Sequence, residues 1–287
     1  MGGTIPVLRT VSTLRAQVKS WRAQADTVAL VPTMGALQAG HLELVRLAKA
    51  RCSRAVVSIF VNPAQFAPNE DFDRYPRDEA GDLAKLAGAG CDLVWSPGRA
   101  EMYPEGFATR IAPAGAAEGL ESDFRPHFFG GVATVCCKLF TQAAPDIAVF
   151  GEKDYQQLAV IRQMVRDLDL PLEIVALPTV READGLAMSS RNAYLSPDQR
   201  RIAPSIYAVI TSVAEAARQG SAIDKAVAAG KRTLESLGFK VDYLEVRDAG
   251  TLKAAEPGAQ GQLRVLAAAW LGKTRLIDNI SIEGRST

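Results

Sequence analysis

Short apolar segments alternate with amphipathic ones up to about residue 180. Val28–Val31 and Ala55–Val61 are almost continuously apolar, as expected for strands buried on both faces of a sheet. Elsewhere apolar residues recur at helical spacing. The pattern predicts strands over 28–31, 55–61, 92–95, 146–150 and 173–180, and helices over 11–25, 40–50, 78–89, 132–143 and 156–167. Strands separated by helices are typical of βαβ units in a parallel sheet.

The pattern changes near residue 181. Residues 181–191 are polar and predict a loop, and Ser196–Gln199 then predicts a helix start with a serine N-cap, a first-turn proline and a capping-box glutamine. The elements expected beyond it are helices to about Gln219 and over 223–237, and strands over 241–246, 263–269 and 275–280. We therefore expect an α/β domain over residues 1–183 and a smaller α+β domain over 184–287.

Charge and hydropathy narrow the class of protein. The 287 residues include 33 Lys and Arg against 32 Asp and Glu, a net charge of +1, which argues against bulk nucleic acid or an anionic membrane as the main partner. No apolar stretch approaches the length of a membrane span, and residues 1–9 hold no secretory leader. The expected location is cytoplasmic.

Cysteine and histidine usage excludes several kinds of site. Cys52, Cys91, Cys136 and Cys137 form no C-x-x-C pair, so we expect buried free thiols rather than a zinc site. His41 and His127 are the only histidines of the sequence. That number excludes a histidine-rich metal cage, and no Ser-His-Asp arrangement is suggested.

Four polar, turn-prone segments follow predicted strands, where an open parallel sheet binds its ligands: Pro32–His41, Asn62–Gln65, Gly151–Asp154 and Met188–Arg191. In the first, glycines permit close backbone approach, and the helix N-terminus after Gly40 offers N–H groups to a phosphate. The segment is neither a Walker A loop nor G-x-G-x-x-G. An ordinary strand-to-helix turn with a solvent-facing histidine is the alternative.

The later segments carry further phosphate-binding residue types. Lys153 could contact a phosphate as a point charge, and Ser189 to Arg191 combine two hydroxyls with a guanidinium fork that suits a phosphate. Gln65 and Gln157 carry amides suited to hydroxyls and a carboxylate. Taken alone, each of these residues also fits a solvated turn or a structural role. Together they indicate a nucleotide-dependent enzyme without a P-loop.

Six segments resemble motifs of the pantothenate synthetase (pantoate–β-alanine ligase) family. They lie in order at sensible spacing, and the similarity runs from about residue 5 to 282. Six coincident matches are far more specific than any one. The segments are Val31–His41, Ser58–Phe66, Arg74–Arg77, Phe150–Gln157, Asp184–Asn192 and Arg275–Asn279.

The resemblance implies a Rossmann-like nucleotidyltransferase domain, a smaller C-terminal domain that helps cover the site, and a homodimer. It also implies a two-step ligation. ATP and pantoate give pantoyl adenylate and pyrophosphate, and β-alanine then attacks the acyl carbon to release AMP and pantothenate. Mg²⁺ accompanies ATP, and neither nucleic acid nor membrane is an expected partner.

The resemblance further implies roles for residues at matching positions. The catalytic candidates are His41, as proton donor near the bridging phosphate oxygens, with Lys153 and Arg191. Gln65 and Gln157 hold pantoate, and Gln65 also lies near β-alanine. The implied ATP contacts, with Asp154 on the ribose side and Val180 bordering the adenine, are Met34, Gly35, Ala36, Leu37, Gln38, Ala39, Gly40, His41, Gly151, Glu152, Lys153, Asp154, Val180, Met188, Ser189, Ser190 and Arg191.

The chain departs from the family pattern at two places. Gln38 stands where the family has histidine, and we expect a neutral donor to suffice there. Gly81 and Lys85 occupy a region where some relatives offer polar contacts near the metal, which leaves Asp82 as a candidate. The metal ligands are otherwise unassigned, with Mg²⁺ held mainly by ATP oxygens and water.

Two other functions remain open. One is an adenylyl- or nucleotidyltransferase of the same fold with a different acceptor, such as a phosphopantetheine-type substrate. The pair Gln65 and Gln157, suited to a small hydroxy acid, argues against it. The other is a nucleotide-sensing module that has lost catalysis, suggested by Gln38.

Overall fold

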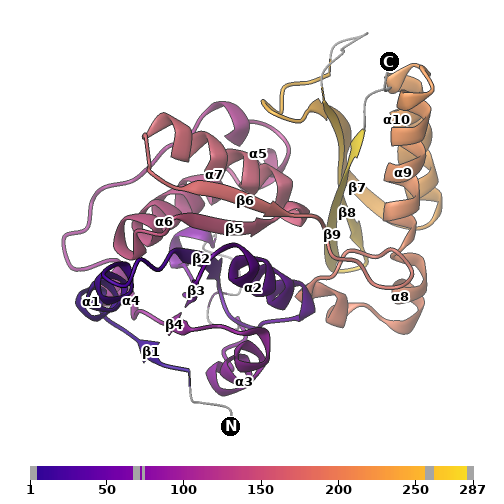
Figure 1. Cartoon of the computed structure of the whole chain (residues 1–287). Helices are drawn as coiled ribbons and strands as arrows, with labels where there is room; N and C mark the ends of the chain where they lie inside the picture. The colour runs from indigo at the N-terminus through magenta and orange to yellow at the C-terminus, as the bar shows by residue number, and fades with distance from the viewer. Residues whose placement is uncertain (1–4, 67–71, 73–74, 256–261, 283–287) are drawn as a thin grey trace. The chain divides into compact units, whose positions relative to one another are not determined.

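The computed structural model describes residues 5–66, 72, 75–255 and 262–282 (Figure 1). By its contacts the chain forms two compact units, residues 1–151 with 160–177 and residues 152–159 with 178–287. The division into domains over residues 1–183 and 184–287 stays a prediction. No described helix is long and apolar enough to span a bilayer.

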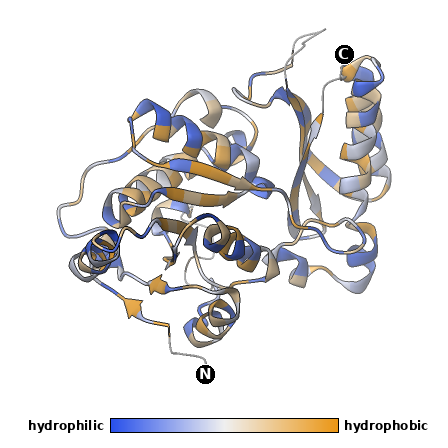
Figure 2. Ribbon diagram, viewed as in Figure 1, coloured by the Kyte–Doolittle hydropathy of each residue, from blue (hydrophilic) through white to orange (hydrophobic). Residues whose placement is uncertain are grey.

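The first unit contains a six-stranded sheet in which every neighbouring pair is parallel. The order is β1-β4-β3-β2-β5-β6, so the chain returns through crossovers. This sheet confirms the α/β expectation. Its strands, coloured mostly as hydrophobic in Figure 2, are β1 (Val7–Leu8), β2 (Val28–Thr33), β3 (Arg54–Ile59), β4 (Leu93–Trp95), β5 (Ile147–Gly151) and β6 (Glu173–Leu177).

Helices pack against both faces of this sheet. Those of the first unit, with α7 shared between the units, are α1 (Val11–Arg22), α2 (Ala39–Arg51), α3 (Glu79–Ala89), α4 (Arg99–Met102), α5 (Glu121–Phe124), α6 (Phe128–Ala143) and α7 (Tyr155–Asp167), with 3₁₀ turns η1 (Pro63–Gln65) and η2 (Gly115–Ala117). Helices α2 and α3 pack together, and α2 contacts β2, β3 and β5, where Val31 and Val57 join the core. Helices α1 and α6 form a second pair, and α6 contacts β2.

Strand β2 runs further than its apolar segment predicts. Pro32 lies inside the strand rather than ending it, in register with Ser58 of β3. The backbone N–H and C=O groups of the even-numbered residues of β2 point toward β5, as the hydrogen bond from the Asp146 N–H to the Val28 carbonyl shows. Pairing with β5 stops at Leu30, so the N–H that proline lacks has no ladder partner to lose.

The second unit contains the antiparallel sheet β7-β8-β9 with α9 and α10 packed together against it. Its elements are η3 (Glu152–Asp154), η4 (Ser190–Tyr194), α8 (Pro197–Ile202), α9 (Ser205–Arg218), α10 (Ile223–Ser236), β7 (Phe239–Asp248), β8 (Leu263–Leu271) and β9 (Thr274–Ile282). Ile210, Leu234 and Val265 are fully buried between the layers. The α+β expectation is confirmed.

The capping box at Ser196 and Gln199 forms as predicted, but the single helix predicted to Gln219 is wrong. The chain leaves the helix at Ala203 and starts α9 after Pro204. Proline has no N–H for an intrahelical bond, and its ring crowds the preceding turn.

Candidate active site

The loop between β2 and α2 is held in a conformation that few residues adopt. Gly35 and Ala36 have φ values of +83° and +52°, both in the left-handed region. A Cβ on Gly35 would lie 3.2 Å from both Asp82 Oδ2 and Ile59 Cγ2. Glycine therefore lets the loop approach α3 closely, and Ala36 carries backbone strain that its surroundings must offset.

Asp82 and Lys85 of α3 hold this loop. The Asp82 carboxylate, 1% exposed, accepts hydrogen bonds from the N–H groups of Ala36 at 2.9 Å and Leu37 at 2.8 Å. Lys85 Nζ donates to the Leu37 carbonyl at 2.9 Å and lies 3.8 Å from Asp82 Oδ1. Both oxygens of Asp82 therefore already bind the loop, and the metal contact considered for Asp82 stays a prediction.

His41 is oriented by the first turn of α2. The Gln38 N–H, at the N-cap, donates to His41 Nδ1 at 3.1 Å. Because Nδ1 accepts, the proton of the neutral imidazole is on Nε2, which is then a donor. The same turn carries the partial positive charge of a helix N-terminus. The geometry fits the predicted donor role, and the contact that Gln38 makes with His41 comes from its main chain.

Gln65 belongs to a buried amide network at the end of β3. Asn62 Nδ2 donates to Gln65 Oε1 at 2.9 Å and to the Gly131 carbonyl at 3.1 Å. Tyr103 Oη donates to Asn62 Oδ1 at 2.8 Å, and burial raises the pKa of Tyr103 to about 12, so the phenol keeps its proton. The network fixes the Gln65 amide with its oxygen accepting and its NH₂ group as the donor end.

Helix α6 closes the far side of this network. A Cβ on Gly131 would lie 2.2 Å from the Ala64 carbonyl oxygen, so only glycine permits this approach to η1. Arg125 donates to the Gln65 carbonyl at 3.0 Å. Asn62, Tyr103 and Arg125 were not predicted individually from the sequence. Only the segment Asn62–Gln65 was a signal, because Tyr103 and Arg125 are distant in sequence.

The second unit gathers three predicted phosphate contacts around one small pocket. Its lining includes Lys153 after β5, and Ser189 and Arg191 at the start of η4. Ser189 Oγ accepts from the Arg191 N–H at 3.2 Å and caps η4. Cations and hydroxyls grouped in this way suit a phosphate, although the cavity of about 10 Å³ is itself no larger than a water site.

A tight hairpin joins two further predicted contacts. The Met188 N–H donates to the Val180 carbonyl at 2.9 Å, and the Glu182 N–H to the Leu186 carbonyl at 2.8 Å. The predicted adenine neighbour, Val180, therefore lies directly beside Met188.

The remaining predicted residues belong to one unit or the other. Asp154 is exposed with its carboxylate 3.7 Å from Lys153 Nζ, Ser190 is exposed, and Gln157 is half-buried on α7. Arg74, in the motif over 74–77, lies outside the described residues. The loop from Met34 to His41, Gln65 and Gly151 are in the first unit, and the other predicted contacts are in the second.

A family model for pantoate–β-alanine ligases matches residues 6–281. The chain belongs to the pantoate–β-alanine ligase family. "Pantothenate synthetase 2" of Bradyrhizobium diazoefficiens is 58% identical over 96% of this chain and 98% of its own length. The pantothenate synthetase of Rhodospirillum rubrum is 55% identical over 97% of this chain and 99% of its own.

Solved structures of ligases in this family are also similar. The crystal structure of the Thermus thermophilus pantothenate synthetase has a TM-score of 0.90 and 46% identity, over 97% of this chain and 99% of that one. The Francisella tularensis pantoate–β-alanine ligase, complexed with β,γ-ATP and β-alanine, has a TM-score of 0.79 and 33% identity, over 96% and 97% of the two chains. The family resemblance seen in the sequence is thereby confirmed.

The cysteines are not among the predicted site residues. All four are free thiols, with Cys52, Cys91 and Cys136 buried and Cys137 half-buried. Burial raises the pKa of Cys136 to about 12, which keeps it as an unreactive thiol. Within the described ranges no three His, Cys, Asp or Glu side chains are grouped to hold a metal ion.

Proposed function

We propose that this protein joins pantoate to β-alanine at the expense of ATP, through an enzyme-bound pantoyl adenylate, releasing AMP and pyrophosphate. The match to the family over residues 6–281 carries the proposal. The grouping of Lys153, Ser189 and Arg191 in the second unit supports it, because adenylation needs cations and donors around a triphosphate.

In the first step a pantoate carboxylate oxygen attacks the α-phosphorus of ATP. A new P–O bond forms while the bond to the bridging oxygen breaks and pyrophosphate leaves. His41, donating from Nε2 beside the α2 N-terminus, stabilises the negative charge that develops on the bridging oxygens. Lys153 and Arg191 neutralise phosphate charge that would otherwise repel the incoming carboxylate.

In the second step the β-alanine amine attacks the acyl carbon of the adenylate. The C–N bond forms, the C–O bond to AMP breaks, and the amine loses a proton. Gln65 and Gln157 hold the pantoyl group in both steps. Asn62 fixes the Gln65 amide so that its NH₂ group donates to pantoate.

Mg²⁺ is proposed to enter with ATP. The Asp82 oxygens are already bonded to the loop, and the described residues form no three-residue metal cluster. Phosphate oxygens and water are therefore the ligands that fit, which Mg²⁺ commonly prefers at ATP sites. The ion would supply further neutralisation of phosphate charge. The homodimer and the cytoplasmic location stay predictions.

The decisive experiment measures AMP and pyrophosphate with each substrate omitted in turn. We expect pantothenate and AMP in equal amounts only when ATP, pantoate and β-alanine are all present. AMP transfer to a phosphopantetheine-type acceptor instead would favour the alternative adenylyltransferase. ATP binding without any turnover would indicate a sensing module and contradict the ligase.

A further inference from the structure

The motif Arg275–Asn279 on β9 has no role in the reaction described above. Two of its members, Asp278 and Asn279, are only 2% and 4% exposed. Burying a carboxylate and an amide in a sheet is costly unless each is fully hydrogen-bonded. Their partners therefore indicate what the motif does.

Asn279 holds the turn that carries Lys153. Its Nδ2 donates to the carbonyls of Glu152 at 2.9 Å and Lys153 at 3.0 Å. Its Oδ1 accepts a hydrogen bond from Arg264 of β8. Both ends of the amide are thus used, and two successive carbonyls of η3 are fixed by one side chain.

Arg264 reinforces the same turn. Its second nitrogen, Nη2, donates to Glu152 Oε2 at 3.0 Å, and its guanidinium carbon lies 3.7 Å from the centre of the Tyr155 ring. Tyr155 Oη in turn donates to the Ala249 carbonyl at 2.9 Å. Within the second unit, the turn is therefore held at its main-chain carbonyls, at the Glu152 carboxylate and at the Tyr155 ring.

Asp278 holds the other phosphate-binding segment through Arg181. The two side chains form a bidentate pair with distances of 2.7 and 2.9 Å. Arg181 also donates to the Gly185 carbonyl at 3.0 Å and stacks over Tyr207. The hairpin that begins at Val180 and leads into η4 is fixed by this arginine.

We propose that Asp278 and Asn279 are positioning residues of the nucleotide site. Asn279 places Lys153, and Asp278, acting through Arg181, places the segment with Ser189 and Arg191. Two adjacent residues of one strand thereby align two segments that are separated in sequence. The proposal rests on the proposed function, in which Lys153 and Arg191 contact phosphate.

A double-mutant cycle tests whether Asn279 acts through Lys153. Calorimetry would measure ATP dissociation constants for the wild type, Asn279→Asp, Lys153→Ala and the double variant. Asn279→Asp keeps an oxygen that accepts from Arg264. It replaces the NH₂ group that donates to the Glu152 and Lys153 carbonyls by a second oxygen, which cannot donate. We expect it to weaken ATP binding about tenfold in the wild type and less than about twofold in the Lys153→Ala background.

Asp278→Asn and Arg191→Ala form the second cycle. We expect Asp278→Asn to weaken ATP binding about tenfold alone and less than about twofold in the Arg191→Ala background. Ile210→Val is the matched control: it opens the buried core of the same unit, and its effect should be the same with or without Lys153→Ala. Additive effects in both cycles would show that Asp278 and Asn279 only stabilise the fold, and would overturn the proposal.

Melting curves would verify that each variant folds. If Asn279→Asp does not fold, Arg264→Lys replaces it, because lysine keeps the charge but cannot bond Asn279 and Glu152 as a fork. The same non-additivity with Lys153→Ala is expected, and additivity again overturns the proposal. A wild type that makes no pantothenate contradicts the proposed function, whereas an active wild type with additive variants contradicts only the positioning roles.

Discussion

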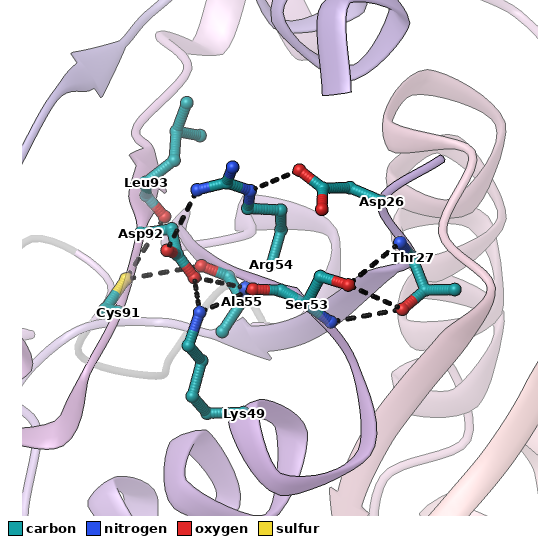
Figure 3. Close-up of polar contacts among 9 residues, drawn as sticks. All are labelled: Asp26, Thr27, Lys49, Ser53, Arg54, Ala55, Cys91, Asp92 and Leu93. Atoms are coloured by element: carbon teal, nitrogen blue, oxygen red, sulfur yellow. Dashed lines mark hydrogen bonds and ion pairs between the residues drawn. The ribbon is translucent and has the colours of Figure 1, made fainter. Parts of the chain in front are cut away.

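The amino-terminal and carboxyl-terminal edges of the six-stranded sheet, where its strands begin and end, carry similar side chains that make different contacts. At the amino ends of β2, β3 and β4, charged residues bind one another and the backbone (Figure 3). Asp92 Oδ2 accepts from Lys49 Nζ at 2.8 Å and from the Ala55 N–H at 2.7 Å. Arg54 Nε donates to Asp26 at 2.7 Å. This edge satisfies its charges internally.

At the carboxyl ends the same chemical groups hold the loop that we propose binds ATP. Asp82, with Lys85 beside it, binds two backbone N–H groups, as Asp92 binds one. The backbone that Asp82 holds has positive φ at Gly35 and Ala36 and leads into the turn with His41. A carboxylate, a lysine and a main-chain donor thus bind one another at the amino ends of the strands, and at the carboxyl ends they hold the proposed ATP loop.

The largest expected effect is at the carboxyl edge. His41→Ala removes the proposed donor to the leaving phosphate oxygens, and we expect turnover to fall by at least about 100-fold. The free energy of unfolding should change by less than about 1 kcal/mol, since the turn loses one half-exposed hydrogen bond. Steady-state AMP release and urea unfolding measure both quantities.

His127→Ala is the matched control, because His127 is exposed and has no proposed role. Its turnover should stay within about twofold of the wild type, the scatter usual for a surface substitution. Near-normal turnover in folded His41→Ala would contradict the assignment of the donor.

Asp82→Asn should have the next largest effect. The substitution keeps the shape but removes the charge, and one amide atom can no longer accept from the loop. We expect the KM for ATP to rise about tenfold, equivalent to about 1.4 kcal/mol, as the left-handed turn relaxes. Initial rates at varied ATP would measure it. An unchanged KM for ATP with a lower free energy of unfolding would show that Asp82, like Asp92, only stabilises the fold.

Asp92→Asn is the counterpart at the amino edge. Lys49 and the Ala55 N–H lose a charged acceptor, and we expect a loss of about 1–3 kcal/mol in unfolding free energy. The turnover and KM should stay within about twofold, because the network ends within the edge. Unfolding curves and rates on one preparation test this, and a raised KM for ATP would remove the distinction between the edges.

Local pattern was enough to predict most of the fold. Strands β2 and β3 are buried on both faces, so their apolar character shows in sequence without knowledge of their partners. Two of the errors came where one residue acts against its surroundings. Pro32 continues a strand because its missing N–H faces no partner, and Pro204 breaks a helix that the apolar periodicity continues.

The loops of the proposed site could be predicted from the sequence, but the residues that hold these loops could not. Lys153, Ser189 and Arg191 carry recognisable phosphate chemistry, and the structure gathers them around one pocket. Asp82 and Asn279 act on backbone far away in sequence, and neither spacing nor composition reveals such a contact. Long-range hydrogen bonds depend on the register of strands and the packing of helices, which a single sequence does not display.

The smallest expected effect is a pH dependence at the amino edge. Cys91 Sγ donates to the Leu93 carbonyl at 3.2 Å within the network of Figure 3, and burial raises the pKa of Cys91 to about 11 from 9.0. The folded protein therefore keeps this proton at pH values where the unfolded chain has lost it. The stabilisation is complete below about pH 9 and is lost as pH rises through about 11.

Comparison of the wild type with Cys91→Ala isolates this thiol from the others. We expect the stability advantage of the wild type to shrink by about 1 kcal/mol between pH 8 and pH 10, because the unfolded thiol ionises first. Urea unfolding at the two pH values gives the difference directly. The catalytic rate should show no matching change when Cys91 is replaced, since nothing at this edge contacts the loop with His41 in the proposed mechanism. A difference between the two proteins that is independent of pH would mean that Cys91 is not shielded from solvent, and that this edge is less tightly closed than the contacts of Asp92 and Arg54 indicate.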